Sequence, residues 1–316
     1  MKNFWRPFAA WVTELKNDPF TRARLKLTAL TTLSILIVFL VAHLTLLKSN
    51  LTPLNFYLLI VICIATASFL ISAKTLSPII QIMRAQKRFI SDASHELRTP
   101  LAIMKTNSEV ALLSGDQISP QEATSTLKSN LEEVDRMSKI IENLLALSYY
   151  DNKFKEIPFQ QINLSKVVIN IVKDTENLAR KKNIHLRLLN TDPGIIMGNP
   201  VAIEQMAINL IKNAVTYTLE GGLVSISVTA RIATLEFKVK DTGIGIEKKD
   251  LPNVFNPFYK AGLGRIQLER ESSGLGLTIV KKIVDRHHGS IYINSAIQKG
   301  TTIIVTLPRA QAEIGN

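Results

Sequence analysis

The sequence contains a single cysteine, Cys63, which lies inside an apolar run. A disulfide within the chain requires two cysteines and a cysteine zinc site requires several, so both are excluded. No spacing among the five histidines suggests a metal-binding helix face. Basic residues are not interleaved with aromatic ones, so we predict no nucleic-acid partner, and the net charge of +12 needs another explanation.

Charged residues are also missing from two long apolar stretches, 27–47 and 54–73. As a helix, the first would extend roughly 31 Å, enough to cross the hydrocarbon core of a bilayer. Lysine and arginine are dense before the first stretch and after the second, whereas the connection 48–53 carries only Lys48. The positive-inside rule therefore predicts a multi-pass hairpin over 27–73 in the cell (inner, cytoplasmic) membrane, with both termini cytoplasmic. A buried hairpin in a soluble protein is the alternative.

The short connection has a consequence for signal input. It leaves no room for a folded sensor domain outside the lipid membrane, so a stimulus would be read within the membrane, from a membrane partner protein, or from the cytoplasm. Residues 1–26, a cytoplasmic N-terminal segment, form either an interfacial amphipathic helix or a simple lead-in. We expect no signal peptide, because the apolar region starts late, is long, and lacks a cleavage site.

A helical stretch with a histidine at the edge of its apolar stripe spans 89–104. His95 is followed at once by Glu96. A neutral imidazole is a nucleophile, and a neighbouring carboxylate can fix its tautomer and accept its proton. A solvated His-Glu pair on a helix surface is the alternative. Pro100 removes the amide that would bond to the Glu96 carbonyl, so a bend is expected there.

Heptad-like spacing predicts a long helix over 79–113, with a start signal at Ser77-Pro78. A capping box at 119–122 opens a second helix. Its apolar face carries Leu127, Leu131, Val134, Ile141 and Leu145. Such a helical hairpin cannot bury its stripe alone, so we predict that 74–150 is a dimerisation domain that forms a four-helix bundle in a homodimer.

After a linker at 151–158, the pattern changes to mixed helices and strands over 159–309, followed by a tail at 310–316. Apolar residues alternate in the predicted strands and recur at helical spacing in the predicted helices. The strands are expected around 184–188, 224–228, 235–239 and 290–307, and the helices around 167–178, 201–217 and 275–287. We predict an α/β sandwich with helices on one face of a mixed sheet.

Two asparagines, Asn209 and Asn213, are four positions apart on the helix predicted over 201–217, so their amides share one face. An amide can ligate Mg²⁺ through its oxygen and bind a phosphate through its nitrogen. Ordinary surface asparagines are the alternative reading of this pair.

Two glycine-rich turns follow in the same unit. Asp241 comes directly after a predicted strand and before Gly243 and Gly245, and its carboxylate can accept a hydrogen bond from an exocyclic amine such as that of adenine. Gly274 and Gly276 open a predicted helix, where backbone amides suit phosphates. Either turn alone is weak support, because glycine after a strand is usually only a turn.

Between these turns lies a long segment of low periodicity, 246–273, with Phe255, Phe258 and Lys260. A loop of this length in a compact domain is usually functional, for example as a lid. Its basic residues Lys260, Arg265 and Arg270 are available for phosphate. A surface loop anchored by two phenylalanines is the alternative.

In this order, these residues resemble the bacterial-type transmembrane sensor histidine kinases of two-component systems. The stretch from His95 to Leu101 matches their phosphoacceptor box, H-E-L-R-T-P-L. The patterns after it resemble the asparagine, glycine and phenylalanine boxes of the ATP domain, the Bergerat or GHKL fold shared with gyrase and mismatch-repair ATPases. The resemblance covers roughly 78–308 and implies a HisKA dimerisation domain followed by an α/β ATP-binding domain.

The resemblance implies that ATP with Mg²⁺ phosphorylates His95, with Glu96 as acid/base, and that the phosphoryl group passes to an aspartate of a response regulator. Thr99 resembles a phosphatase residue acting on that regulator; a hydroxyl bonded back to its own helix is the alternative. Asn209 would ligate Mg²⁺ and Asp241 would bind adenine. The remaining implied nucleotide-site residues, which contact phosphate or adenine, shape the pocket or anchor the lid, are Asn213, Tyr217, Gly243, Gly245, Phe255, Phe258, Lys260, Gly274 and Gly276.

Two departures concern phosphate binding. Thr216 stands where the family often has lysine, and Lys260 replaces a frequent arginine, which keeps the charge but loses the bidentate fork. Two other functions stay open from the sequence: a gyrase-like ATPase without phosphohistidine chemistry, and a non-catalytic membrane signalling scaffold.

Overall fold

The computed structural model describes Leu33, Ile37, Leu40 and Val41, and residues 53–152, 158–262 and 273–310, without the side chains of 53–60, 63–79, 116, 151 and 152. The chain divides into two units, Met1–Ile90 and Ser91–Asn316. In the first unit, the predicted span 27–47 lies outside the described residues apart from the four named above, which are helical. In the part of the chain that the structure describes, no helix combines the length and the apolarity that a membrane crossing requires.

Helix α3 runs without a break over Pro53–Ser114, so the helix start predicted at Ser77-Pro78 is wrong. A serine followed by proline permits a helix to begin, because proline in a first turn loses no hydrogen bond. It does not force a start when good helix formers continue on both sides, and the interior proline then removes one backbone hydrogen bond.

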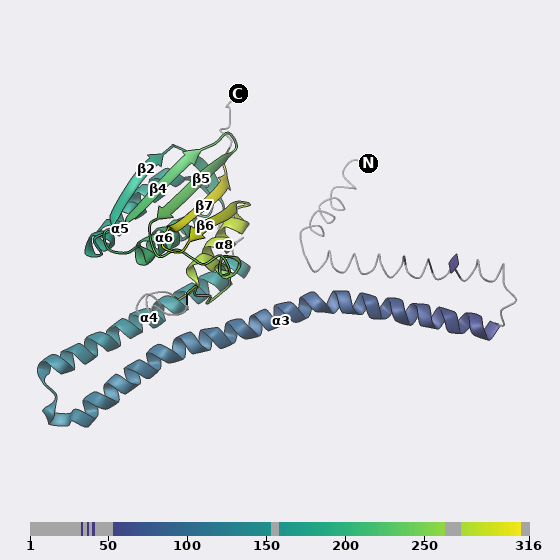
Figure 1. Cartoon of the computed structure of the whole chain (residues 1–316), viewed down its shortest axis with the longest axis horizontal. Helices are drawn as coiled ribbons and strands as arrows, with labels where there is room; N and C mark the ends of the chain where they lie inside the picture. Colours follow the sequence, from purple (N-terminus) through teal and green to yellow (C-terminus); the bar gives the residue numbers. More distant parts are fainter. Residues whose placement is uncertain are drawn as a thin grey trace. The chain divides into compact units, whose positions relative to one another are not determined.

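The second unit begins with a helical hairpin, which Figure 1 shows as antiparallel helices α3 and α4, joined by the short 3-10 helix η1 (Gly115–Gln117). Helix α4 spans Pro120–Asn152. The predicted capping box is confirmed: the Ser119 amide donates to Glu122 Oε2 at 2.9 Å, and the Glu122 amide donates to Ser119 Oγ at 3.2 Å. Asn107 joins the two helices by donating to Asn130 Oδ1 at 3.0 Å.

The remainder of the unit is an α/β sandwich, as predicted. Its five-stranded sheet has the order β2-β4-β5-β7-β6, in which β2 and β4 are parallel and the other neighbours are antiparallel. The strands are β2 (His185–Thr191), β4 (Leu223–Ala230), β5 (Thr234–Asp241), β6 (Ser290–Ala296) and β7 (Gly300–Pro308). A separate antiparallel pair, β1 (Gln160–Asn163) and β3 (Ile195–Gly198), was not predicted.

Three helices cover one face of this sheet in Figure 1: α5 (Leu164–Lys181), α6 (Pro200–Tyr217) and α8 (Gly276–Arg286). The core lies between the layers, because every second residue of β4 and β5 points inward. Val224, Ile226, Val228, Leu235 and Phe237 are completely buried there. Each fully buried side chain of this size stabilises the fold by roughly 1.5–3 kcal/mol.

The buried ring of His287 connects the end of α8 to the start of α6. Its Nδ1 lies 2.7 Å from the Ile283 carbonyl oxygen, and its Nε2 accepts a hydrogen bond from the Asn199 amide at 3.1 Å. Phe159 stacks on the ring at 4.8 Å. Burial lowers the pKa of His287, which suits a neutral ring that donates at one nitrogen and accepts at the other. The end of α8 is thereby tied to the start of α6.

Candidate functional site

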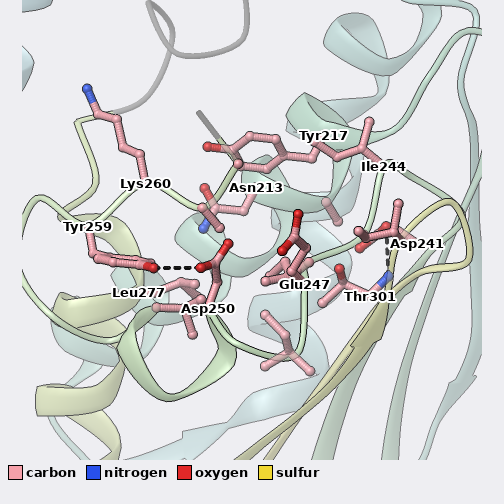
Figure 2. Close-up of a pocket in the computed structure, with 18 of the residues that line it drawn as sticks. Asn213, Tyr217, Asp241, Ile244, Glu247, Asp250, Tyr259, Lys260, Leu277 and Thr301 are labelled. Atoms are coloured by element: carbon pink, nitrogen blue, oxygen red, sulfur yellow. Dashed lines mark hydrogen bonds between the residues drawn. The ribbon is translucent and has the colours of Figure 1, made fainter. Parts of the chain in front are cut away.

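A cavity of about 410 Å³ lies between α6, the end of β5, the loop after it, and β7 (Figure 2). Five of the predicted site residues line it: Asn213, Tyr217, Asp241, Gly245 and Lys260. Sequence reasoning did not identify the other polar residues of its wall, Glu247, Asp250, Tyr259 and Thr301. Its size lies within the range of small-molecule sites.

The carboxylate of Asp241 is a buried polar group of this cavity, with 7% of the residue exposed. Its Oδ1 accepts hydrogen bonds from the Gly243 amide at 2.8 Å and the Thr301 amide at 3.1 Å. Figure 2 shows its second oxygen turned toward the cavity. Burial is the largest influence on the Asp241 pKa and raises it, against these hydrogen bonds. The side chain is therefore fixed at one oxygen and offers the other to a hydrogen-bond donor.

Much of the remaining wall of the cavity is apolar. Leu210, Ala214, Val239, Ile246 and Ile303 contribute to it. An aliphatic wall beside one fixed acceptor suits a flat heteroaromatic ring that presents an amine to the acceptor. The ring would contact the wall through its faces and Asp241 through its edge.

Two predicted glycines have a geometry that other residues would not tolerate. Gly245 has a φ of +68°, and a Cβ there would collide with the Ala296 carbonyl. Gly274 also has a φ of +68°, and its Cβ would lie 2.7 Å from the Phe258 carbonyl carbon. Side chains at both positions would be strained as well as crowded. At Gly276 the nearest atom, Asn213 Nδ2, would be 3.6 Å away, which is ordinary contact.

A second cavity, of about 520 Å³, shares Asn213 and Tyr217 with the first. Asn209, Gly274 and Gly276 also line it. The Nδ2 of Asn209 is buried and forms no hydrogen bond with any residue that the structure describes. A buried amide without a partner is costly unless a ligand supplies one. Asn209 and Asn213 therefore both line this cavity.

The residues of this second cavity can bind Mg²⁺, but they would supply only a few of its ligands. The described residues include no group of three or more histidine, cysteine or acidic side chains placed to hold a metal ion. Mg²⁺ commonly uses only one or two protein ligands, and its other ligands are water and substrate phosphates. The amide oxygen of Asn209 fits this arrangement, with the remaining ligands supplied by water and the bound molecule.

The predicted catalytic residues lie on α3 near the loop that carries Lys260. His95 is exposed, whereas Glu96 is partly buried and its Oε1 lies 2.8 Å from the Lys260 ammonium. Lys260, expected to contact phosphate, thus lines the first cavity while its charge pairs with Glu96. The Thr99 hydroxyl donates to the His95 carbonyl oxygen at 3.1 Å, which is the helix back-bond that the sequence left open.

The predicted lid is described only in part. Of the described residues that line the two cavities, neither Phe255 nor Phe258 is one. Phe258 instead donates its amide to the Gly274 carbonyl at 3.0 Å, with a positive φ of 60°. Arg265 and Arg270 fall in 263–272, outside the described residues.

Comparison with known proteins identifies two domains in the chain. Residues 85–153 match the His Kinase A (phospho-acceptor) domain. Residues 198–311 match the histidine kinase-, DNA gyrase B- and HSP90-like ATPase. The sensor protein kinase PmrB of Pseudomonas aeruginosa is 34% identical over 232 residues, which cover 73% of this chain and 47% of PmrB. The chain spans about half the length of the curated relatives it matches.

Solved structures agree in fold. The histidine kinase AdeS of Acinetobacter baumannii has a TM-score of 0.56 and 25% identity, covering 69% of this chain and 98% of AdeS. The histidine kinase ThkA, solved in complex with the response regulator protein TrrA, has a TM-score of 0.57 and 19% identity, covering 73% of this chain and 64% of that chain. At 19% identity the second likeness concerns the fold alone.

Proposed function

Because this chain carries the phosphoacceptor domain and the ATPase domain of the two-component histidine kinases, we propose that it phosphorylates His95 from Mg-ATP and passes the phosphoryl group to an aspartate of a response regulator. The observation that carries the proposal is the 2.8 Å contact between Glu96 and Lys260. Lys260 belongs to the wall of the first cavity, so the His-Glu pair lies beside the candidate nucleotide site.

The two cavities suggest how ATP binds. The adenine ring occupies the first cavity and donates its amine to the free oxygen of Asp241. The phosphates extend past Asn213 into the second cavity. Asn209 would hold Mg²⁺, which when bound offsets the negative charge of the phosphates. Asn213 donates to a phosphate oxygen through its amide nitrogen.

The residues of α3 perform the transfer. An unprotonated ring nitrogen of His95 attacks the γ-phosphorus, and the bond between that phosphorus and the bridging oxygen breaks. ADP leaves with the electron pair of that bond. Glu96 orients the ring and accepts the proton from its other nitrogen. For this step Glu96 must give up its contact with Lys260, whose ammonium is then available to the phosphates.

We also propose that the protein is a homodimer anchored in the cell membrane. The chain acts as a homodimer, because the predicted apolar face of α4 is exposed in a single chain: Leu127, Leu131, Val134, Ile141 and Leu145 are all at least 45% exposed. The apolar stretches 27–47 and 54–73 anchor it in the cell membrane with both termini cytoplasmic. Dephosphorylation of the regulator through Thr99 belongs to the same proposal and requires its hydroxyl to leave the His95 carbonyl.

The full-length chain in detergent, incubated with γ-labelled ATP and Mg²⁺, tests the proposal. We expect acid-labile, alkali-stable label on the wild type, and none on His95→Ala, because His95 directly precedes the proposed base in the sequence. His185→Ala is the matched control, since His185 is an exposed histidine on β2, and it should label like the wild type. Label on His95→Ala would contradict the proposal.

The same experiment separates the alternatives. ATP hydrolysis at an equal rate in the wild type and His95→Ala, without label on either, would indicate a gyrase-like ATPase. Failure of the wild type to bind ATP would indicate a non-catalytic scaffold. Binding is measured separately by calorimetry, so that a protein that binds nucleotide but does not transfer phosphate is recognised.

A further inference from the structure

The second cavity has walls from both domains of the second unit. Helix α4 of the hairpin contributes one side, and α6 and the start of α8 contribute the other. Four basic residues line it, against two acidic ones, Glu132 and Asp135. The basic residues are Arg136 and Lys139 from α4, together with Lys182 and Lys212. A cavity with an excess of positive charge beside the unpartnered amide of Asn209 suits a phosphate chain.

Arg136 differs from the other basic residues in its surroundings. Its side chain is 19% exposed, whereas Lys139 and Lys212 are exposed residues. Its guanidinium lies 3.7 Å from Glu96 Oε2 and 3.7 Å from Glu133 Oε2. These are ion-pair distances rather than hydrogen bonds. Both glutamate oxygens are buried without a hydrogen-bond partner, so the described contacts leave the planar donors of Arg136 available to an additional anion.

One cation therefore touches the proposed base and also lines the proposed phosphate cavity. Glu96 and a terminal phosphate are both negative and would repel each other at close range. A guanidinium that contacts both relieves this repulsion, and its planar fork can bind two phosphate oxygens at once. The exposed lysines of the same cavity have no planar fork, and the described ion pairs include none between them and Glu96.

We propose that Arg136 binds the γ-phosphate of ATP and positions it against His95, so that the phosphoacceptor hairpin completes the nucleotide site. The inference rests on the proposed function. Arg136 takes no part in bond making: the N–P bond forms at His95, and ADP leaves with the electrons of the broken P–O bond. Its positive charge stabilises the charge on the transferred group.

The test compares Arg136→Ala and Arg136→Lys with the wild type in the full-length chain. We expect Arg136→Ala to lower the rate constant of His95 phosphorylation by about 100-fold or more, as for other arginines that contact a transferred phosphoryl group. ATP should bind about tenfold more weakly, whereas ADP, which lacks the γ-phosphate, should bind within about twofold of wild type. Arg136→Lys should be intermediate, because it keeps the charge and loses the fork.

Lys128→Ala is the matched control, since Lys128 is an exposed basic residue on the same helix, and it should behave as wild type. The ratio of ATP to ADP affinity is the decisive measurement. An Arg136 that only supported Glu96 or the hairpin would leave this ratio unchanged, and so would a variant that is merely less well folded. An unchanged ratio, or a wild-type phosphorylation rate in Arg136→Ala, would overturn the proposal.

The two proposals fail in different ways. Absence of phosphohistidine in the wild type would count against the proposed function. Nucleotide affinities are measured by calorimetry without phosphotransfer, so they still decide whether Arg136 contacts the γ-phosphate. Partial recovery of phosphorylation in Arg136→Ala by added guanidinium, at a concentration that leaves the wild type folded, would further support the assignment.

Discussion

The carboxylate of Asp241 is held in a position where its charge is unfavourable without a ligand. Burial raises its pKa, so in the folded chain its ionised form is less stable than in the unfolded chain. Between the ordinary aspartate pKa and the raised one, the folded state binds more protons. The stability contributed by this group is thus fully present below the unfolded pKa and is lost as the pH rises through the folded pKa.

We predict that Asp241→Asn lowers the affinity for ATP without lowering the stability of the fold. At pH 7 the variant without nucleotide should melt at the wild-type temperature or above, because the amide keeps an acceptor for the Gly243 and Thr301 amides. Its affinity for ATP should fall about 10- to 100-fold through loss of a charge-assisted hydrogen bond. Calorimetric titration and thermal unfolding measure the two effects.

The pH dependence provides the control. Any stability gained by Asp241→Asn should shrink as the pH falls toward the ordinary aspartate range, where the wild-type carboxyl is protonated in both states. A variant that is strongly destabilised at pH 7 and binds ATP normally would contradict this account of Asp241.

Among larger elements, the turn after β5 owes its shape to contacts with distant parts of the chain. The Ile244 amide donates to the Tyr217 carbonyl at 3.2 Å, and the Ile244 carbonyl accepts from the Gln298 amide at 2.8 Å. The end of α6 and the turn between β6 and β7 therefore hold this part of the first cavity wall. The absence of a side chain at Gly245 permits the close approach to Ala296.

We predict that Gly245→Ala impairs folding and nucleotide binding together. The substitution combines a left-handed backbone, which costs a non-glycine residue about 1 kcal/mol, with a collision against the Ala296 carbonyl. The wall must move to relieve it, so ATP affinity should fall by about tenfold or more. Chemical denaturation and calorimetric titration provide the measurements.

Gly221→Ala is its matched control. Gly221 has a φ of +76°, and a Cβ there would meet nothing within 4 Å. That variant should therefore lose only the backbone contribution of about 1 kcal/mol and keep its affinity for ATP. Equal losses of ATP affinity in the two variants would show that the contact with Ala296 is unimportant.

At the scale of the whole molecule, the hairpin of a single chain exposes a stripe of large apolar side chains. Leu131 on α4 is 62% exposed, and it shares a predicted stripe with Leu127 and Leu145. A second copy would cover this stripe and complete the four-helix bundle.

We predict that Leu131→Asp weakens the dimer. A carboxylate placed in an apolar interface without a partner is unfavourable by several kcal/mol, roughly, so the variant should have a monomeric mass at concentrations where the wild type is dimeric. Light scattering on the full-length chain in detergent measures the mass. Ile232→Asp makes the same kind of change at a fully exposed position on the ATPase domain and should remain dimeric. Dimers of unchanged stability in Leu131→Asp would place the interface elsewhere.

Local sequence determined much of this protein. The capping box at Ser119 and the alternation of β4 and β5 express geometry within a few residues, and the structure confirms both. Asn209 and Asn213, four positions apart on α6, line the same cavity. The α/β sandwich also followed from periodicity. The unpredicted pair β1 and β3 has only four residues in each strand, too few to give a clear alternation.

Only the tertiary structure decided which distant residues meet. Lys260 and Glu96 are separated by 164 positions, and no periodicity links them, yet they form a 2.8 Å contact. Thr301 reaches Asp241 because β7 pairs with β5, and Arg136 reaches the second cavity because α4 forms one of its walls. Sequence patterns encode the hydrogen bonds and faces of single elements. The packing of whole elements against one another decides which charges share a cavity, because that packing depends on side chains throughout the core.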